Sequence, residues 1–134
     1  MKILLLISAL VFGFCSADYS KQQIAEIMQV TKQCYKKLDI PFDSDLIERV
    51  MYNRDFPDDQ TTKKFINCML IDLGFWESEG VIDREAVVNF MAEQYDSEKV
   101  REVVGKCFRP TGTTQEDKAF NYLRCFFKNK TFVI

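Results

Sequence analysis

The sequence of 134 residues contains no histidine. This absence excludes the Ser-His-Asp and Cys-His arrangements of nucleophilic catalysis, and it excludes any metal site built on imidazole. It also removes the one side chain whose ordinary pKa lies close to neutrality, so the chain has no histidine-based pH switch. No pair of carboxylates stands out as a general acid and base. We therefore expect a protein that is not an enzyme and that uses no metal or cofactor.

Other scarce features exclude further classes. The chain has three prolines and five glycines, and no stretch of useful length alternates between polar and apolar residues, so a β-sheet is not expected. It contains no Cys-x-x-Cys pair, which argues against a structural zinc site. The net charge is −2 and no basic stripe is present, which argues against nucleic acid as a partner.

The first part of the chain differs in composition from the rest. Lys2 gives it a positive start, residues 3–14 are almost all apolar, and residues 15–17 are small. This arrangement is typical of a secretory signal peptide. The apolar run is shorter than the about 20 residues that a membrane helix needs. We therefore expect residues 1–17 to be removed, leaving a secreted, extracellular protein without a membrane anchor.

Residues 18–134 have the length of one domain, and they retain Cys34, Cys68, Cys107 and Cys125. An even number of cysteines in a short secreted chain indicates disulfides. Four cysteines allow three pairings, and the residues alone do not choose among them. Each bridge between helices would stabilise the fold by about 3–4 kcal/mol.

Apolar residues recur at intervals of three and four through most of this domain, which is the pattern of amphipathic helices. Ser20 followed by Gln23 forms a capping-box start, and Pro41 ends the first helix. Gly74 stands where a left-handed residue is expected after the third helix. The pattern predicts an all-α fold with six helices, at about 20–38, 43–51, 59–74, 83–91, 97–108 and 114–127.

Three stretches and the lone cysteine of the first helix form a distinctive set. The stretches are FPDD at 56–59, CMLIDLGF at 68–75 and ESEGVIDREAVV at 77–88. Together they resemble the insect odorant-binding protein family, and the resemblance covers nearly all of residues 18–134. It implies a compact bundle of about six helices that encloses an apolar cavity.

The cysteines resemble those of one subclass of this family. Most members have six, and Cys34, Cys68, Cys107 and Cys125 match the first, third, fourth and sixth. Loss of the other two is the pattern of the four-cysteine, or minus-C, subclass. The resemblance then implies that the first cysteine pairs with the second one present here, and the third with the fourth.

Lys64 and Glu116 occupy the two positions where most relatives have the additional cysteines. A disulfide would hold the Cα atoms of such positions about 5.5–6 Å apart. The opposite charges would allow an ion pair in place of the bridge. We slightly favour the alternative, in which the two side chains are solvated separately on the surface.

The candidates for lining the implied cavity are inward-facing apolar side chains of the later helices and the C-terminus. Aromatic and methionine side chains suit this role, because they supply large or adaptable apolar surfaces. The candidate ligand-binding residues are Met69, Leu73, Trp76, Phe90, Met91, Val100, Val103, Val104, Phe120, Phe126 and Phe132. Tyr122 or Tyr52 is the candidate for orienting a carbonyl or hydroxyl group of the ligand.

The C-terminal residues NKTFVI support two incompatible interpretations. Asn129 begins an N-glycosylation sequon. The apolar residues 132–134 could instead fold over the cavity as a lid, as in several members of the family, with the terminal carboxylate as a pH-sensitive group. We favour the lid.

These observations predict a carrier that binds small hydrophobic molecules of the odorant or pheromone type. Its expected partners are that ligand and a chemosensory receptor, and its expected state is a monomer or a weak homodimer. One alternative is a non-olfactory carrier of haemolymph, saliva or reproductive secretions. Another is a secreted helical signalling protein that acts through its surface and has no cavity.

Overall fold

The computed structural model describes residues 18–134, and the predicted signal peptide at 1–17 lies outside the described residues. Within the described part, no helix combines the length and the apolar character needed to cross a membrane. The predicted all-α fold is confirmed, because six helices make up most of this part of the chain. They are α2 (Lys21–Lys37), α3 (Leu46–Met51), α4 (Gln60–Asp72), α5 (Arg84–Met91), α6 (Ser97–Cys107) and α7 (Gln115–Asn129).

Two short strands follow α4 and correct the expectation that no sheet would form. β1 (Trp76–Ser78) pairs with β2 (Val81–Ile82) as an antiparallel hairpin. Gly80 turns the chain between them with a φ of 79°, a conformation that glycine adopts readily. The strands are too short for an alternating pattern to be visible in the sequence.

Side-chain caps determine where most of the helices begin. Ser20 and Gln23 form the predicted capping box at α2, and Thr114 caps α7. Asp96 caps α6 by accepting hydrogen bonds from two backbone N–H groups, so the cap lies just before the predicted first residue. α3 has the weakest start, because its N-cap residue Asp45 makes no side-chain hydrogen bond.

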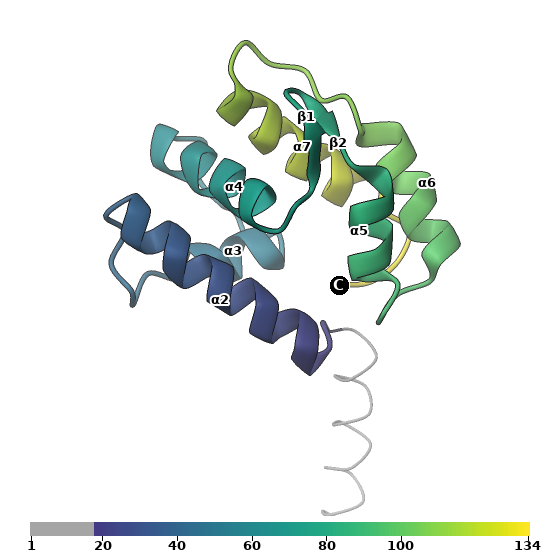
Figure 1. Cartoon of the computed structure of the whole chain (residues 1–134), viewed down its shortest axis with the longest axis horizontal. Helices are drawn as coiled ribbons and strands as arrows, with labels where there is room; N and C mark the ends of the chain where they lie inside the picture. Colours follow the sequence, from purple (N-terminus) through teal and green to yellow (C-terminus); the bar gives the residue numbers. More distant parts are fainter. Residues whose placement is uncertain (1–17) are drawn as a thin grey trace, which may run out of the picture.

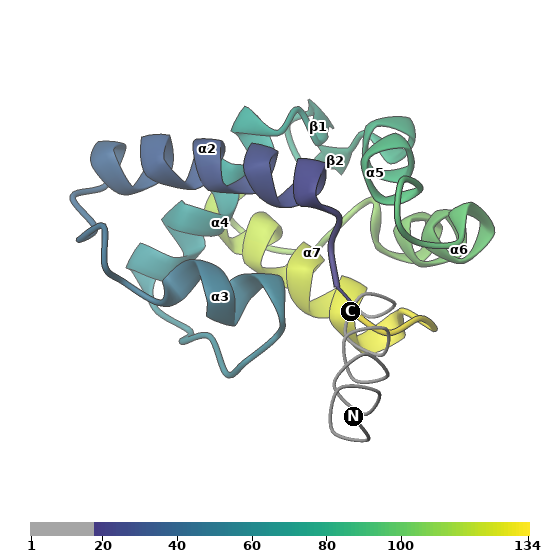
Figure 2. The same ribbon diagram turned by 90° about the horizontal axis from the view of Figure 1, so that it is seen from below.

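The helices form two groups with α7 between them (Figures 1 and 2). One group consists of α2, α3 and α4, and the other consists of α5 and α6 packed side by side. α7 packs against α4 of the first group and α6 of the second. Because α7 has neighbours on both sides, its apolar residues face the interior in more than one direction.

Two disulfides link helices within this arrangement. Cys34–Cys68 joins α2 to α4, with Cα atoms 5.9 Å apart. Cys107–Cys125 joins α6 to α7, with Cα atoms 5.8 Å apart. The pairing implied by the family resemblance is therefore confirmed.

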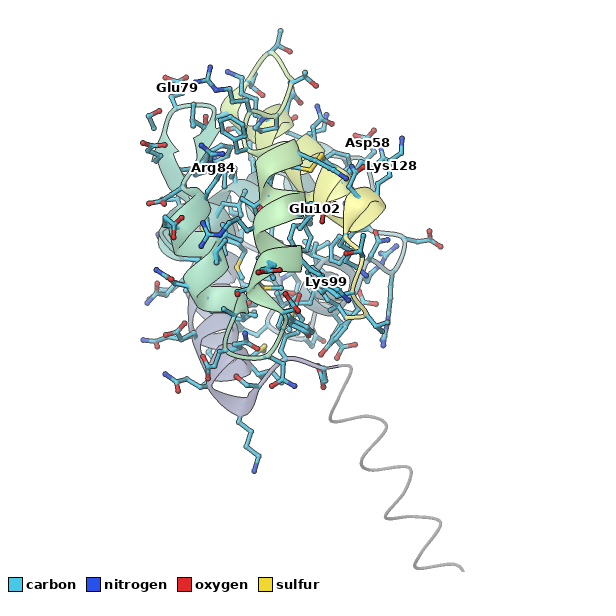
Figure 3. The ribbon with its side chains drawn as sticks, turned by 90° about the vertical axis from the view of Figure 1, so that its right-hand side faces the viewer. Asp58, Glu79, Arg84, Lys99, Glu102 and Lys128 are labelled. Atoms are coloured by element: carbon cyan, nitrogen blue, oxygen red, sulfur yellow. A yellow bond between two sulfur atoms is a disulfide. The ribbon has the colours of Figure 1, made fainter. Side chains whose placement is uncertain are left out.

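Charged side chains cover the outside of the bundle. Figure 3 shows Lys99 and Glu102 extending from the outer face of α6, and both are exposed. Val100, Val103 and Val104 lie on the opposite face of the same helix and are buried. α6 thus has the apolar stripe and polar face of an amphipathic helix at a protein surface.

An ion pair joins α4 to α7, but it is formed by neighbours of the predicted residues. Lys63 Nζ lies 3.0 Å from a carboxylate oxygen of Asp117 and 3.5 Å from one of Asp58. Within residues 18–134 no ion pair joins Lys64 to Glu116, and Lys64 is exposed. The hypothesis of a pair between Lys64 and Glu116 is therefore not supported, and the favoured alternative of separate side chains holds. One step along a helix turns a side chain by about 100°, which brings their sequence neighbours together instead.

We expect the ion pair between Lys63 and Asp117 to stabilise the fold measurably. Its hydrogen bond to Lys63 lowers the pKa of Asp117. The stabilisation is therefore present above the ordinary aspartate pKa of about 3.9 and is lost as the pH falls through the lower value of the folded state. Urea denaturation of Lys63→Met, Asp117→Asn and the double variant should give non-additive free energies of unfolding at pH 7.

The matched control is the same cycle on Lys64→Met and Glu116→Gln, which should be additive. Additive behaviour of the Lys63 cycle at pH 7 would contradict a stabilising pair.

Candidate functional site

An apolar cavity of about 100 Å³ lies between five of the helices. α2, α3, α4, α5 and α7 all contribute to its wall, and the described lining includes no charged side chain. The lining residues are Tyr19, Ile27, Ile47, Val50, Met51, Ile66, Met69, Leu70, Leu73, Phe75, Val87, Phe90, Met91, Tyr122, Leu123, Phe126 and Phe127. Such a space can accept an apolar group and offers no chemistry that would transform it.

The wall combines methionines with paired aromatic rings. Met51, Met69 and Met91 come from three different helices, and their flexible thioethers adapt to apolar groups of different shape. Phe75 packs edge-to-face against Phe90, with ring centroids 5.5 Å apart. This geometry is favourable because the edge of an aromatic ring is positive and its face is negative. The wall therefore has both adaptable and more rigid parts.

The structure brings five of the predicted ligand-binding residues together at this cavity. They come from the end of α4, from α5 and from α7, so helices distant in sequence converge on one space. These five residues are Met69, Leu73, Phe90, Met91 and Phe126.

The predicted valines of α6 lie elsewhere. Val100, Val103 and Val104 are buried on a helix that packs against α5 and α7, and none of them lines the cavity. Trp76 also lies outside the lining, and its ring N–H donates to Asn67 Oδ1 at 3.1 Å. An apolar stripe identifies the buried face of a helix, but it does not identify which neighbour that face meets.

The two remaining predicted residues, Phe120 and Phe132, are also absent from the described lining. Phe120 packs edge-to-face against Phe56, with ring centroids 5.5 Å apart. The ammonium group of Lys63 lies 5.8 Å from the centroid of the Phe120 ring. Phe120 of α7 therefore packs against Phe56 and beside Lys63 of α4, outside the described lining.

α3 supplies part of the wall that was not predicted. Ile47, Val50 and Met51 line the cavity, and their spacing in the predicted second helix could have identified them as inward-facing. Tyr19 and Phe75 lie outside the helices, where helical periodicity gives no signal.

Two tyrosines carry the only hydroxyl groups in the described lining. Tyr122 is 3% exposed, and its hydroxyl makes no hydrogen bond with residues 18–134. The Tyr19 hydroxyl donates to the carbonyl oxygen of Met51 at 3.2 Å. Burial raises the pKa of both tyrosines. Both hydroxyls therefore remain protonated, and able to donate a hydrogen bond, at neutral pH.

Two further tyrosines lie beside Tyr19 and outside the described lining. The rings of Tyr52 and Tyr95 meet the Tyr19 ring edge-to-face at centroid distances of 5.9 and 5.8 Å. The Tyr52 hydroxyl donates to Asp18 Oδ1 at 2.6 Å, and burial together with this bond raises the pKa of Tyr52 to about 12. The Tyr95 hydroxyl is buried and has no hydrogen-bond partner among residues 18–134.

The C-terminal residues pack against the outside of the cavity wall. The Phe132 ring lies 5.3 Å from the Tyr95 ring and 6.1 Å from the Phe126 ring, measured between centroids. The carbonyl of Phe132 accepts a hydrogen bond from Lys130 Nζ at 2.7 Å. Val133 points outward and is 69% exposed. Since Phe126 lines the cavity, Phe132 contacts a residue of the cavity wall.

Asn129, the predicted glycosylation site, is half-buried at the last turn of α7. Its Nδ2 donates to the carbonyl oxygen of Cys125 at 2.8 Å. This nitrogen is the atom to which a glycan would be attached. Glycosylation of Asn129 stays a prediction.

One group of potential metal ligands occurs in the described part of the chain. It consists of Cys34, Cys68 and Asp72. The two sulfur atoms are bonded to each other, so neither is a thiolate that could bind a metal. Asp72 forms an ion pair with Lys37 at 3.2 Å. The group is therefore part of the link between α2 and α4.

Comparisons with known proteins agree with this geometry. A model of the PBP/GOBP family matches residues 16–129, and no curated protein matches the sequence. A structure of fatty acid binding protein OBP56a from the oral disk of the blowfly Phormia regina is similar over 84% of this chain and 95% of that chain, with 21% identity and a TM-score of 0.66. The medfly odorant-binding protein CcapOBP22/CcapOBP69a is similar over 78% of this chain and 87% of that chain, with 22% identity and a TM-score of 0.56. At these identities the two structures support the fold.

We expect the buried tyrosines to make the fold sensitive to alkali. In the unfolded chain they ionise at about pH 10, whereas in the folded protein Tyr19, Tyr95 and Tyr122 have raised pKa values. Their contribution to stability is therefore full below about pH 10 and is lost as the pH rises through the folded-state values. For one fully buried tyrosine the free energy of unfolding should fall by about 1.4 kcal/mol per pH unit above pH 10.

Urea denaturation at a series of pH values measures this loss, and Tyr122→Phe should reduce its slope. An unchanged slope in Tyr122→Phe would contradict burial of this hydroxyl.

Proposed function

This chain belongs to the PBP/GOBP family of insect odorant-binding proteins, and from this we propose that it is an extracellular carrier of small hydrophobic molecules. Members of this family carry such molecules without transforming them. The observation that carries the proposal is the cavity between five helices, whose described lining is apolar apart from two hydroxyl groups. Secretion is proposed from the signal-peptide pattern in residues 1–17.

Binding in such a cavity would be driven by removal of apolar surface from water. Each Å² removed contributes about 25 cal/mol before the entropic cost of fixing the ligand. A lining without charged side chains supports this mode, because neither partner has to give up strong hydration. The selectivity would then follow size, shape and apolar area more than charge.

The size of the cavity limits what it can hold without a change in the wall. Its volume is about 100 Å³, whereas an engineered cavity that binds benzene measures about 150 Å³. A ligand of odorant size would therefore have to displace side chains. Met51, Met69 and Met91 are suited to move, because their side chains are unbranched and flexible. Half-buried Leu73 and Phe127 could turn outward.

The proposal also concerns the kind of hydrophobic molecule that the protein carries. We favour odorant or pheromone-like molecules, with a chemosensory receptor as the downstream partner. The similar blowfly protein is described as a fatty acid binding protein, which supports a lipid-like cargo as the second candidate. Non-olfactory secretions remain the alternative setting, and the tissue in which the protein is expressed distinguishes them.

Displacement of a fluorescent apolar dye tests whether the cavity is the binding site. Leu73, the C-cap residue of α4, lines the cavity. Leu73→Trp should fill the cavity and lower the dye affinity by about tenfold. The apolar contact that one segment of the ligand would lose is worth about 1.4 kcal/mol. Leu38→Trp is the matched control, because Leu38 is a half-buried C-cap residue of α2 outside the lining.

Leu38→Trp should bind the dye like the unmodified protein. Equal affinity of both variants and the unmodified protein would place dye binding outside the cavity. A complete lack of dye binding by the unmodified protein would favour a protein that acts through its surface.

We also propose that the C-terminal residues act as a lid on the outer side of the wall. Phe132 packs against Tyr95 and Phe126, so Phe132→Ala should loosen this part of the wall. The dissociation rate of the dye should rise by about 3- to 10-fold, because one aromatic contact is worth about 0.5–1.5 kcal/mol. The control is Val133→Ala, which changes an exposed neighbour. Stopped-flow measurement of dye release compares the two, and equal rates would contradict the lid.

A further inference from the structure

The polar groups at the cavity are unevenly distributed. Of the described lining residues, Tyr19 and Tyr122 carry hydroxyl groups, and the other side chains are apolar. The two hydroxyls are not equivalent. Tyr19 already donates to the carbonyl oxygen of Met51, whereas Tyr122 makes no hydrogen bond with residues 18–134. Tyr122 therefore has the one uncommitted donor at this apolar surface.

A buried hydroxyl group without a hydrogen bond is unusual in a folded protein. Buried polar groups are nearly always hydrogen-bonded, because leaving one unpaired loses its interaction with water without replacement. Tyr122 is 3% exposed and comes from the middle of α7. Its position on the cavity wall means that a bound molecule is the group that can reach its hydroxyl.

The absence of charge in the lining restricts that partner. Lys130, the C-cap residue of α7, lies outside the lining, and its Nζ donates to the carbonyl of Phe132. Asp18 is engaged by Tyr52, also outside it. A carboxylate or an ammonium group in the cavity would therefore be buried without a countercharge, which is strongly unfavourable.

We propose that Tyr122 donates a hydrogen bond to an uncharged acceptor oxygen on the ligand, so that the cavity selects neutral esters, ketones or alcohols over ionised fatty acids and amines. This inference rests on the proposed carrier function. Tyr122 is then a specificity-determining residue, and the apolar remainder of the ligand lies against the methionines and phenylalanines of the wall. The similar blowfly protein carries the name of a fatty acid binder, and the present chain should differ from an ionised-acid binder in this respect.

Competition against a bound fluorescent dye at pH 7 tests the proposal with five compounds that share an octyl-length chain. They are methyl octanoate, octanol, octanoate, octylammonium and octane. In the unmodified protein, octanoate and octylammonium should bind at least about tenfold more weakly than the ester and the alcohol. Tyr122→Phe should weaken binding of the ester and the alcohol by about 2- to 10-fold and leave octane unchanged.

Tyr95→Phe is the matched control. It removes another buried hydroxyl that has no partner among residues 18–134 and that lies outside the lining. It should leave the affinity for all five compounds unchanged. Tyr52→Phe should also leave the five affinities unchanged. This result would show that Tyr122, and not Tyr52, orients the ligand, the role for which the sequence offered both tyrosines.

The outcomes distinguish this inference from the proposed function. If the compounds displace the dye but Tyr122→Phe affects the ester and octane equally, the carrier function stands and the role of Tyr122 is overturned. Tight binding of octanoate at pH 7, or loss of ester binding in Tyr95→Phe alone, also overturns it. If no compound displaces the dye, the proposed function and this inference both fail. Circular dichroism of each variant confirms that the helices are retained.

Discussion

The packing of α4 against α7 is the interaction on which the rest of the structure depends. Cys34–Cys68 ties α2 to α4, and Cys107–Cys125 ties α6 to α7. Covalent bonds thus attach one outer helix to each member of the central pair, while the pair itself is held by apolar packing and one ion pair. A partly exposed ion pair stabilises a fold far less than a disulfide does. The junction between α4 and α7 is therefore held by packing and charge and not by a covalent bond.

The cavity lies across this junction. Ile66 and Met69 of α4 and Leu123 and Phe126 of α7 all line it, so a small shift between the two helices changes its volume directly. The two disulfides link α2 to α4 and α6 to α7, so neither of them crosses this junction. Movement at this junction would let the cavity enlarge for a ligand while the packing within each disulfide-linked pair of helices is kept. The additional bridge that the family resemblance implies for most relatives would cross this same boundary and restrict it.

Local rules predicted the helices, and tertiary packing decided what they face. Ser20, Gln23 and Thr114 act within a few residues of the chain, so the helices they begin could be identified from the sequence. Val103 shows the limit of the same reasoning, because its stripe on α6 is buried against other helices and not against the cavity. Lys63 shows the same limit of local reasoning more clearly. A charged contact between α4 and α7 was one of two hypotheses for Lys64 and Glu116, and their sequence neighbours Lys63 and Asp117 make it instead.

The titratable groups of the described lining constrain how the affinity of this carrier can depend on pH. Tyr19 and Tyr122 are the only ones, and burial raises the pKa of both. Neither changes charge between pH 5 and 8, so the interior presents the same hydroxyls and apolar surface across this range. A pH dependence of binding there has to originate outside the described lining of the cavity. Release that is independent of pH has to come from movement of the wall, and the junction between α4 and α7 is a part of that wall that no disulfide crosses.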